Sequence, residues 1–507
     1  MSDEPMRDGS MRDAPMRDEP SIGEPSIGDP QPPGRGHLDV TPIEDTPGRP
    51  PGRIARALGW LDERTSIARV VRAGMRKVFP DHWSFLLGEI ALFCFVILVL
   101  TGTFLTFFYV PSASEVTYTG PYAPMAGTQV SAAYDSVLRI SFETKAGLLM
   151  RQIHHWTALL FVAVVVLHLC RVFFTGAFRR PREVNWIVGF TLLVLAMALG
   201  FTGYSLPDDL LSGTGARIAY SAALSIPLIG PWLASLLFGG EFPTAAFISR
   251  FYVLHIMLLP GLVIGLIVGH IALLVLQKHT QYRGGPARED NVVGRAFWPS
   301  QAFLSSGLFF LTAAICALFG ALFQINPVWL FGPFDAAIVS SPAQPDWYVG
   351  WLDGALRIFP PFEPTILGIT IPSPFIPGIV IPGILFTIVA LWPFVEARVT
   401  GDSRPHHLLD RLWEHPFRTA SGVAILTFFA VLTLAGGNDV LAFQFGFDVG
   451  FLTRLFRWLA VLLPIAAWIV TYRLCRARRQ EGEHPAPPLA GHAVVRRPDG
   501  GFEEIHE

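Results

Sequence analysis

Four histidines stand in two pairs inside strongly apolar stretches of the sequence. His154 and His168 lie 14 residues apart in "RQIHHWTALLFVAVVVLHLCR", and His255 and His270 lie 15 apart in "RFYVLHIMLLPGLVIGLIVGH". An α-helix turns by about 100° per residue, so 14 steps return to within about 40° of the start and 15 steps to within about 60°. If both stretches are helices, each pair faces one side of its helix, with the two rings about 21–22 Å apart along the axis.

Paired imidazoles at this spacing predict two sites for heme iron. Imidazole binds iron, copper and zinc, but a zinc site needs further ligands close by. Two helices that run the same way bring His154 level with His255, and His168 level with His270. His155 is out of phase with His168, because 13 steps turn by about 220°. We therefore expect His155 to face the bundle surface or a partner subunit.

Two pairs of glycines repeat the same spacing in neighbouring apolar stretches. Gly88 and Gly102 are 14 residues apart, and so are Gly189 and Gly203. A residue without a side chain lets the edge of a flat porphyrin approach the backbone. Taken alone, such pairs more often mark close helix packing, but their match to the histidine spacing favours helices that flank two hemes.

Three arginines lie at the ends of the histidine stretches. Arg151 and Arg250 are placed beside one predicted site and Arg171 beside the other. Guanidinium groups pair well with carboxylates, so we expect them to bind heme propionates. The alternative is that they orient the spans or extend to the membrane surface.

The composition is that of a membrane protein. Of 507 residues, 51% are hydrophobic and 15% charged, with a mean hydropathy of +0.44. The net charge of −2 gives no reason to expect a nucleic-acid partner. The four cysteines form no CxxC or CxxCH motif, so neither a disulfide framework nor a covalent heme site is indicated.

Eight stretches are long and apolar enough to span a bilayer, which predicts an all-α polytopic fold. They lie near 85–109, 150–174, 186–204, 251–276, 303–325, 377–396, 419–436 and 455–475. Two weaker segments, 218–239 and 364–376, are interrupted by Pro and Gly and fit interfacial hairpins better than spans.

Basic residues gather in every second loop. Lys and Arg cluster in "RRPR" after the second span, in the loops after the fourth and sixth spans, and in "YRLCRARR" after the eighth. By the positive-inside rule, both termini are cytoplasmic and the chain lies in the cell membrane as a multi-pass protein.

The chain divides into five predicted regions. They are a disordered repeat tail (1–50), a cytoplasmic amphipathic segment (51–84), an N-terminal four-helix domain with the two heme sites (85–290), a C-terminal four-helix domain (291–475) and a cytoplasmic tail (476–507).

Several motifs resemble cytochrome b, the quinol-oxidising subunit of cytochrome bc complexes. "GYSLPDDLLSGTG" resembles the segment after the third helix of that family, "RFYVLH" its fourth helix and "QPDWYVGW" its quinol-site loop. "DHWSFLLGEIAL", "RQIHHW", "FFTGAFRRPREVNW" and "HAVVRRPDGGFEEIHE" resemble the actinobacterial branch. The resemblance covers about residues 75 to 507, with the repeat tail outside it.

The resemblance implies two non-covalent b-type hemes with four axial ligands. His154 and His255 would hold the low-potential heme near the outer face, and His168 and His270 the high-potential heme near the cytoplasm. Some photosynthetic members hold an extra covalent heme through a cysteine, but Leu86 stands at that position here.

The resemblance also implies the activity of a proton-translocating quinol–cytochrome c oxidoreductase. One electron of the quinol passes to a Rieske iron–sulfur subunit and the other through the hemes to quinone at an inner site. Asp346 would accept the quinol proton, and its presence instead of the commoner Glu favours menaquinol. Tyr348 would form a hydrogen bond at the site or pack the loop, and Asp353 is a further acid for proton exit.

The implied partners are a Rieske subunit, a cytochrome c subunit and membrane lipid. A homodimeric complex and a supercomplex with an oxidase are also expected. The inner quinone site is less defined: Lys278, His279, Gln281 and Asp290 would bind quinone, supply protons or be solvated. His406, His407 and His415 are interpreted as surface residues.

Two other classes of protein compete with this interpretation. A diheme membrane anchor of a dehydrogenase would pass electrons to quinone without splitting them, but such anchors have fewer spans and lack the "PDWY" loop. A transporter with structural histidines is disfavoured by the paired spacing.

Overall fold

The computed structural model describes residues 53–480, apart from 243 and 339–343, together with 493–496 and 502–505. The predicted repeat tail lies outside the described residues. Contacts divide the chain into two units, 1–68 and 69–507, and the first is described from Arg53 onward. In the first unit, α1 (Arg53–Thr65) carries the apolar residues Ile54, Leu58 and Leu61. Spacings of four and three residues place them on one face of the helix, so α1 is amphipathic. The next helix, α2 (Ile67–Met75), begins at the end of this unit.

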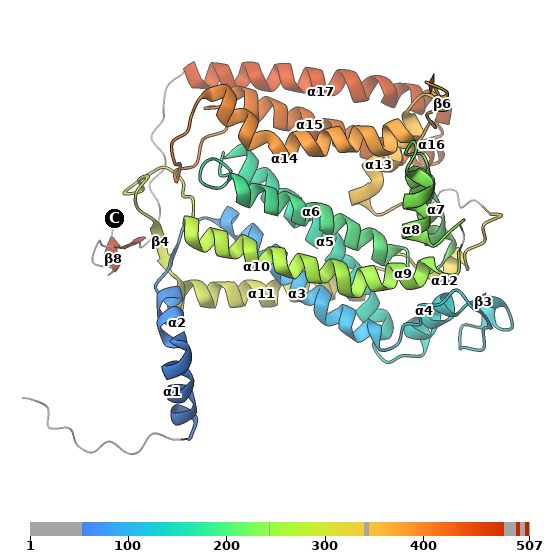
Figure 1. Ribbon diagram of the computed structural model, residues 1–507, viewed down its shortest axis with the longest axis horizontal. Coiled ribbons are helices and arrows are strands. Elements are labelled where there is room, and N and C mark those ends of the chain that lie inside the picture. Colours follow the sequence, from blue (N-terminus) through green and yellow to red (C-terminus); the bar gives the residue numbers. More distant parts are fainter. Residues whose placement is uncertain (1–52, 243, 339–343, 481–492, 497–501, 506–507) are drawn as a thin grey trace, which may run out of the picture. The chain divides into compact units, whose positions relative to one another are not determined.

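Among the described residues of the second unit, eight helices are long and apolar enough to cross a membrane, which confirms the predicted all-α polytopic fold. Figure 1 shows them running alongside one another. Their bounds are Trp83–Thr106 (ending in α3, Leu86–Thr106), Gly147–Phe174 (α5), Glu183–Tyr204 (α6), Phe247–Gln277 (α9 to α10), Phe297–Leu322 (ending in α11, Ala302–Leu322), Ile376–Thr400 (ending in α14, Ile381–Thr400), Pro416–Gly436 (α15) and Val449–Gln480 (α17).

The fourth span contains a stretch of π-helix. It is built from α9 (Phe247–Val253), a π-helical turn (Leu254–Leu258) and α10 (Leu259–Gln277). Pro260 is the second residue of α10 and has no N–H to donate to the preceding turn. A π turn absorbs one extra residue. The 15-residue spacing of His255 and His270 therefore becomes equivalent to the 14-residue spacing in α5.

Shorter elements connect the spans. The helices are α4 (Ala132–Phe142), α7 (Leu210–Leu224), α8 (Gly230–Phe238), α12 (Val328–Phe331), α13 (Trp347–Ile358) and α16 (Asn438–Phe445). The strands are β1 (Val78–Phe79), β2 (Glu115–Thr117), β3 (Gln129–Ser131), β4 (Val293–Ala296), β5 (Thr365–Ile366), β6 (Ile369–Thr370), β7 (Ala493–Arg496) and β8 (Phe502–Ile505).

These short elements form small antiparallel sheets and hairpins. The order β1-β4-β7-β8 joins the start of the second unit to the chain's last strands, while β2–β3 and β5–β6 are two-stranded. The two segments predicted as hairpins are the helix pair α7–α8 and the β5–β6 hairpin. Asp209 begins α7 with a capping box, because its carboxylate accepts from the Ser212 N–H at 3.1 Å.

Two apolar cores organise the spans. One joins α3, α5, α6 and α10 around Phe95, Phe161 and Val263 and includes Tyr348 from α13. The other joins α13, α15 and α17 around Trp351 and Phe456. Helix α13 contributes to both cores, so the residues at its start are fixed relative to α5.

Candidate functional site

The four predicted histidines form two facing pairs between α5 and the fourth span. The ring centroids of His154 and His255 are 6.2 Å apart, and those of His168 and His270 are 6.4 Å apart. The ring planes in the two pairs are inclined at 73° and 76°. The pairing that helical geometry predicts is therefore the pairing found in the structure.

In the first pair, the Nδ1 atom of each ring is already engaged. His154 Nδ1 lies 2.9 Å from Thr101 Oγ1, and this hydroxyl itself donates to the Ile97 carbonyl at 2.7 Å, so it accepts from the ring. His255 Nδ1 donates to the Leu199 carbonyl at 3.0 Å and lies 3.3 Å from Thr202 Oγ1. A hydrogen bond at Nδ1 fixes the tautomer and leaves Nε2 as the metal-binding nitrogen.

Each predicted glycine lies against one histidine. A Cβ atom would approach the histidine Cε1 to 3.3 Å at Gly88 (His168), 3.2 Å at Gly102 (His154), 3.3 Å at Gly189 (His270) and 2.4 Å at Gly203 (His255). The glycines therefore make room for the imidazole rings.

The threonines were missed in the sequence, although a signal was present. Thr101–Gly102 and Thr202–Gly203 are the same dipeptide, and each precedes its histidine by the same interval, 53 residues from threonine to histidine. In each dipeptide the threonine lies beside Nδ1 and the glycine admits the ring.

These residues fit a heme. A metal–imidazole bond is about 2.0–2.1 Å and the nitrogen lies about 1.1 Å from the ring centroid, so two axial imidazoles on one metal have centroids about 6 Å apart. Both pairs meet this distance. A shared cluster of three or more His, Cys, Asp or Glu residues, as zinc would favour, is not found among the described residues.

The arginines differ in their surroundings. Arg151 donates from both terminal nitrogens to the Asn326 carbonyl at 3.2 Å, and its Nε is buried without a partner among the described residues. Arg171 packs over Phe85 at 4.1 Å, and its Nε and Nη2 are likewise buried and unpaired within the described chain.

Arg250 is placed differently. It is exposed and donates to the carbonyls of Ser235 and Leu236 in α8. Its N–H groups are therefore already used in part. Binding of propionates stays a prediction for all three arginines.

Asp346 stands at the start of α13, as the N-cap residue of the "PDWY" segment. His155 Nε2 lies 3.0 Å from both of its carboxylate oxygens, and the Tyr348 hydroxyl donates to Oδ2 at 3.2 Å. The side chain of Asp346 is only 9% exposed. Gly200 in α6 makes room for Tyr348, since a Cβ atom there would lie 2.3 Å from the tyrosine oxygen.

The orientation expected for His155 is wrong. Its ring points toward α13, and its side chain is 16% exposed. The helical phase was read correctly, because His155 does point away from the His154–His255 pair. What the sequence could not provide was the position of a partner 191 residues away.

Comparison with known proteins decides the family. The chain is 47% identical over 454 residues to the "Cytochrome bc1 complex cytochrome b subunit" of Streptomyces coelicolor, covering 89% of this chain and 83% of that protein. Proteins of the same description from Mycobacterium tuberculosis and Corynebacterium diphtheriae are 46% and 44% identical over 90% of this chain, which matches 83% and 84% of their lengths. The chain belongs to the cytochrome b family of cytochrome bc1 complexes.

Two further similarities agree with this family. The family model "Cytochrome b(N-terminal)/b6/petB" matches residues 159–333. A chain of a "Hyperthermophilic respiratory Complex III" aligns with a TM-score of 0.60 at 21% identity, covering 82% of this chain and 99% of that one. At this identity the likeness shows the fold. Cytochrome b proteins bind b-type hemes, and the two facing histidine pairs fit such groups.

The tightest of the four glycine–histidine contacts gives a direct prediction. In Gly203→Ala, the new Cβ would lie 2.4 Å from His255 Cε1 and displace the ring. We expect heme affinity at the first pair to fall about 10–100-fold, as for other losses of ligand orientation. Heme content per chain in the purified protein measures this. Gly307→Ala is the matched control, because a Cβ there meets nothing within 4 Å. An unchanged heme content in Gly203→Ala would contradict the assigned contact.

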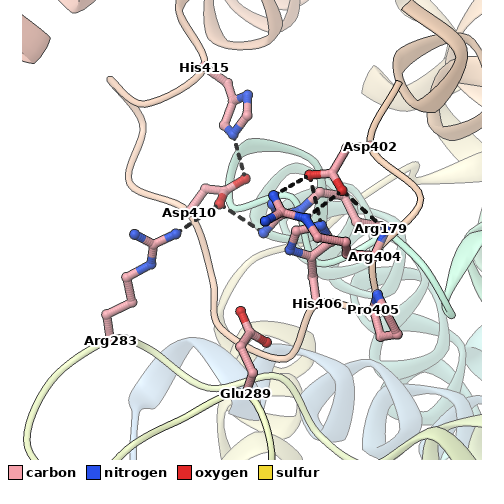
Figure 2. A pocket seen from close by; sticks show the side chains of 9 residues that line it. All are labelled: Arg179, Arg283, Glu289, Asp402, Arg404, Pro405, His406, Asp410 and His415. Carbon is pink, nitrogen blue, oxygen red and sulfur yellow. Dashed lines mark hydrogen bonds and ion pairs between the residues drawn. The ribbon is translucent and has the colours of Figure 1, made fainter. Parts of the chain in front are cut away.

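A polar cavity of about 380 Å³ lies among three loops of this cytochrome b (Figure 2). It is lined by Arg179, Arg283, Glu289, Asp402, Arg404, Pro405, His406, Asp410 and His415. Burial alone would raise the pKa of Asp410, but the hydrogen bond from His415 and the charges of Arg179 and Arg418 hold it at about 2. Arg179 and Arg283 come from two other loops and both pair with Asp410, at 2.8 Å and 3.6 Å, so these ion pairs hold the three loops together.

The histidines of these loops are more than surface residues. His406 Nε2 lies 3.2 Å from Asp402 Oδ2, and His415 Nε2 lies 3.2 Å from Asp410 Oδ2. His407 Nδ1 accepts from Arg182 Nη2 at 2.9 Å. These three histidines are partly exposed, and each also has a polar partner.

Proposed function

We propose that this cytochrome b oxidises a quinol, with menaquinol favoured, at an outer site beside Asp346. It would deliver one electron to a Rieske iron–sulfur subunit and the other across the membrane to quinone at an inner site. The proposal rests on two observations. The four histidines form two facing pairs, and Asp346 is hydrogen-bonded to His155, the residue of α5 that follows His154 of the first pair. The bound hemes would supply the electron path between the two sites.

The chemistry of the outer site requires a base close to the quinol hydroxyl. Asp346 is the acid that matches the motif, and Tyr348 supports it with a hydrogen bond. A partly buried carboxylate held by two donors is oriented to accept a proton. The shorter Asp instead of Glu is the reason to favour menaquinol.

Proton exit would continue along α13. Asp353 lies in α13, seven residues after the N-cap residue Asp346 and about 10 Å further along the helix axis. Asp353 pairs with Arg357 at 2.6 Å, and Arg357 pairs with Asp439 at 2.8 Å. Burial raises the pKa of Asp353, which favours a carboxyl that can hold a proton in transit.

The proposed orientation places both termini in the cytoplasm, so the His168–His270 pair lies at the cytoplasmic side. We also propose the division of the chain into the five regions predicted from the sequence, with the segments 51–84 and 476–507 in the cytoplasm. Near this pair, His279 packs against Phe79 with ring centroids 4.7 Å apart. Burial, together with Arg171 and other nearby cations, lowers the pKa of His279 to about 4.

The inner quinone site is therefore proposed around His279. Gln281 is used by its own loop, because its side chain accepts from the Val293 N–H at 2.8 Å and donates to the Arg288 carbonyl at 2.8 Å. A structural role for Gln281 is thus favoured over quinone binding.

Proteins of this family are subunits of a complex. We propose a Rieske subunit and a cytochrome c subunit as partners, together with membrane lipid. A homodimeric complex, its association with an oxidase and proton translocation across the cell membrane belong to the same proposal.

A redox titration of the heme spectrum tests this function. The reduced-minus-oxidised spectrum of the purified protein is expected to contain b-type heme that titrates in two steps of different potential, with about two hemes per chain. A single redox step with one heme per chain would show that the proposed electron path across the membrane is incomplete. Absence of heme would contradict the proposed function.

A further inference from the structure

We propose that His155 is a positioning residue for Asp346: its Nε2–H holds the carboxylate in the orientation that accepts the quinol proton. This role rests on the proposed function of Asp346. It assigns a purpose to the second histidine of the "HH" doublet, which the heme sites do not use.

The contact itself is specific. His155 Nε2 is equidistant, at 3.0 Å, from both oxygens of Asp346. A carboxylate only accepts hydrogen bonds, so Nε2 must carry the hydrogen. The role needs no change in the protonation of His155, because a neutral ring with its hydrogen on Nε2 can donate to the carboxylate in this geometry.

The position of His155 in the helix explains why it is suited to this task. Its neighbour His154 faces His255 across the first pair, and one residue later the helix has turned by about 100° toward α13. His154, which is proposed to bind heme, is therefore followed directly in the chain by His155, which holds the proposed proton acceptor Asp346. This fixes Asp346 with respect to the electron acceptor at the moment of quinol oxidation.

Rigid surroundings make the contact a good positioning device. Tyr348 is 3% exposed and belongs to the core around α5, and its hydroxyl binds Oδ2 of the same carboxylate. The carboxylate thus receives one donor from α5 and one from α13. Without His155, only the donor from its own helix would hold it, and the side chain would gain rotational freedom.

The test compares His155→Leu with His155→Gln in the purified complex, using a naphthoquinol as substrate. Loss of the donor in His155→Leu is expected to lower kcat about 10–100-fold, which corresponds to one hydrogen bond to a charged group. The KM should change little, because the interaction matters for the transition state. His155→Gln keeps an N–H donor and is expected to recover most of the rate.

A double-mutant cycle completes the test. In the Asp346→Asn background, His155→Leu should cause no further loss, because the side chain that His155 positions can no longer accept a proton. Normal kcat in His155→Leu would overturn the inference, as would equal losses in Leu and Gln variants or additive effects in the cycle. If Asp346→Asn is slow and His155→Leu is normal, the inference alone fails. If Asp346→Asn itself is normal, the proposed role of Asp346 fails.

Discussion

Asp346→Asn is expected to slow quinol oxidation by about 10²-fold or more while both hemes stay bound. The amide is nearly the same size as the carboxylate but cannot take up a proton, and general-base catalysis typically contributes 10²–10⁴-fold. Among the described residues, this side chain forms hydrogen bonds with His155 and Tyr348 and with none of the four paired histidines. The heme spectrum should therefore be that of the unmodified protein.

The measurement is the rate of heme reduction by a naphthoquinol in the purified complex, followed after rapid mixing. Asp448→Asn is the matched control, since Asp448 is an exposed acid at the start of α17 and its capping contact with the Phe451 N–H is one that asparagine can also make. A normal rate in Asp346→Asn would show that another group receives the quinol proton.

The pairing of the four histidines was predictable because it depends on helical repeats. Spacing within one helix fixes which side chains share a face, and it identified His154, His168, His255 and His270. The spacing of His255 and His270 is one residue longer than that of His154 and His168. The π turn before Pro260 in the fourth span absorbs this extra residue. Sequence alone gave no reason to place a π turn there, although the proline marks the position.

Contacts between distant segments were less predictable. The Asp346–His155 contact depends on how α13 packs between two cores, and no local pattern determines that packing. The same holds for Arg250, whose donors reach the carbonyls of α8. The sequence predicts a loop at "PDWY", yet α13 begins at Trp347, directly after the proposed proton acceptor Asp346.

The adjacent histidines are expected to behave in opposite ways when each is replaced by leucine. His154→Leu removes one imidazole from the first pair, whose rings face one another at 6.2 Å. The heme at that site would then keep one protein ligand, His255, and we expect heme content to fall from about two to about one per chain. Electron transfer across the membrane would stop, since one step of the path is missing.

His155→Leu changes the same helix at the next residue and should keep both hemes, because its ring faces Asp346. The two variants share size, charge change and position in α5, so they control for each other's effect on folding. A pyridine hemochromogen assay counts the hemes, and a redox titration shows which potential is lost. Two hemes in His154→Leu, or loss of one in His155→Leu, would reverse the ligand assignment within the doublet. Only His154 has the geometry of a ligand, since Thr101 holds its Nδ1 at 2.9 Å and so directs Nε2 toward the site.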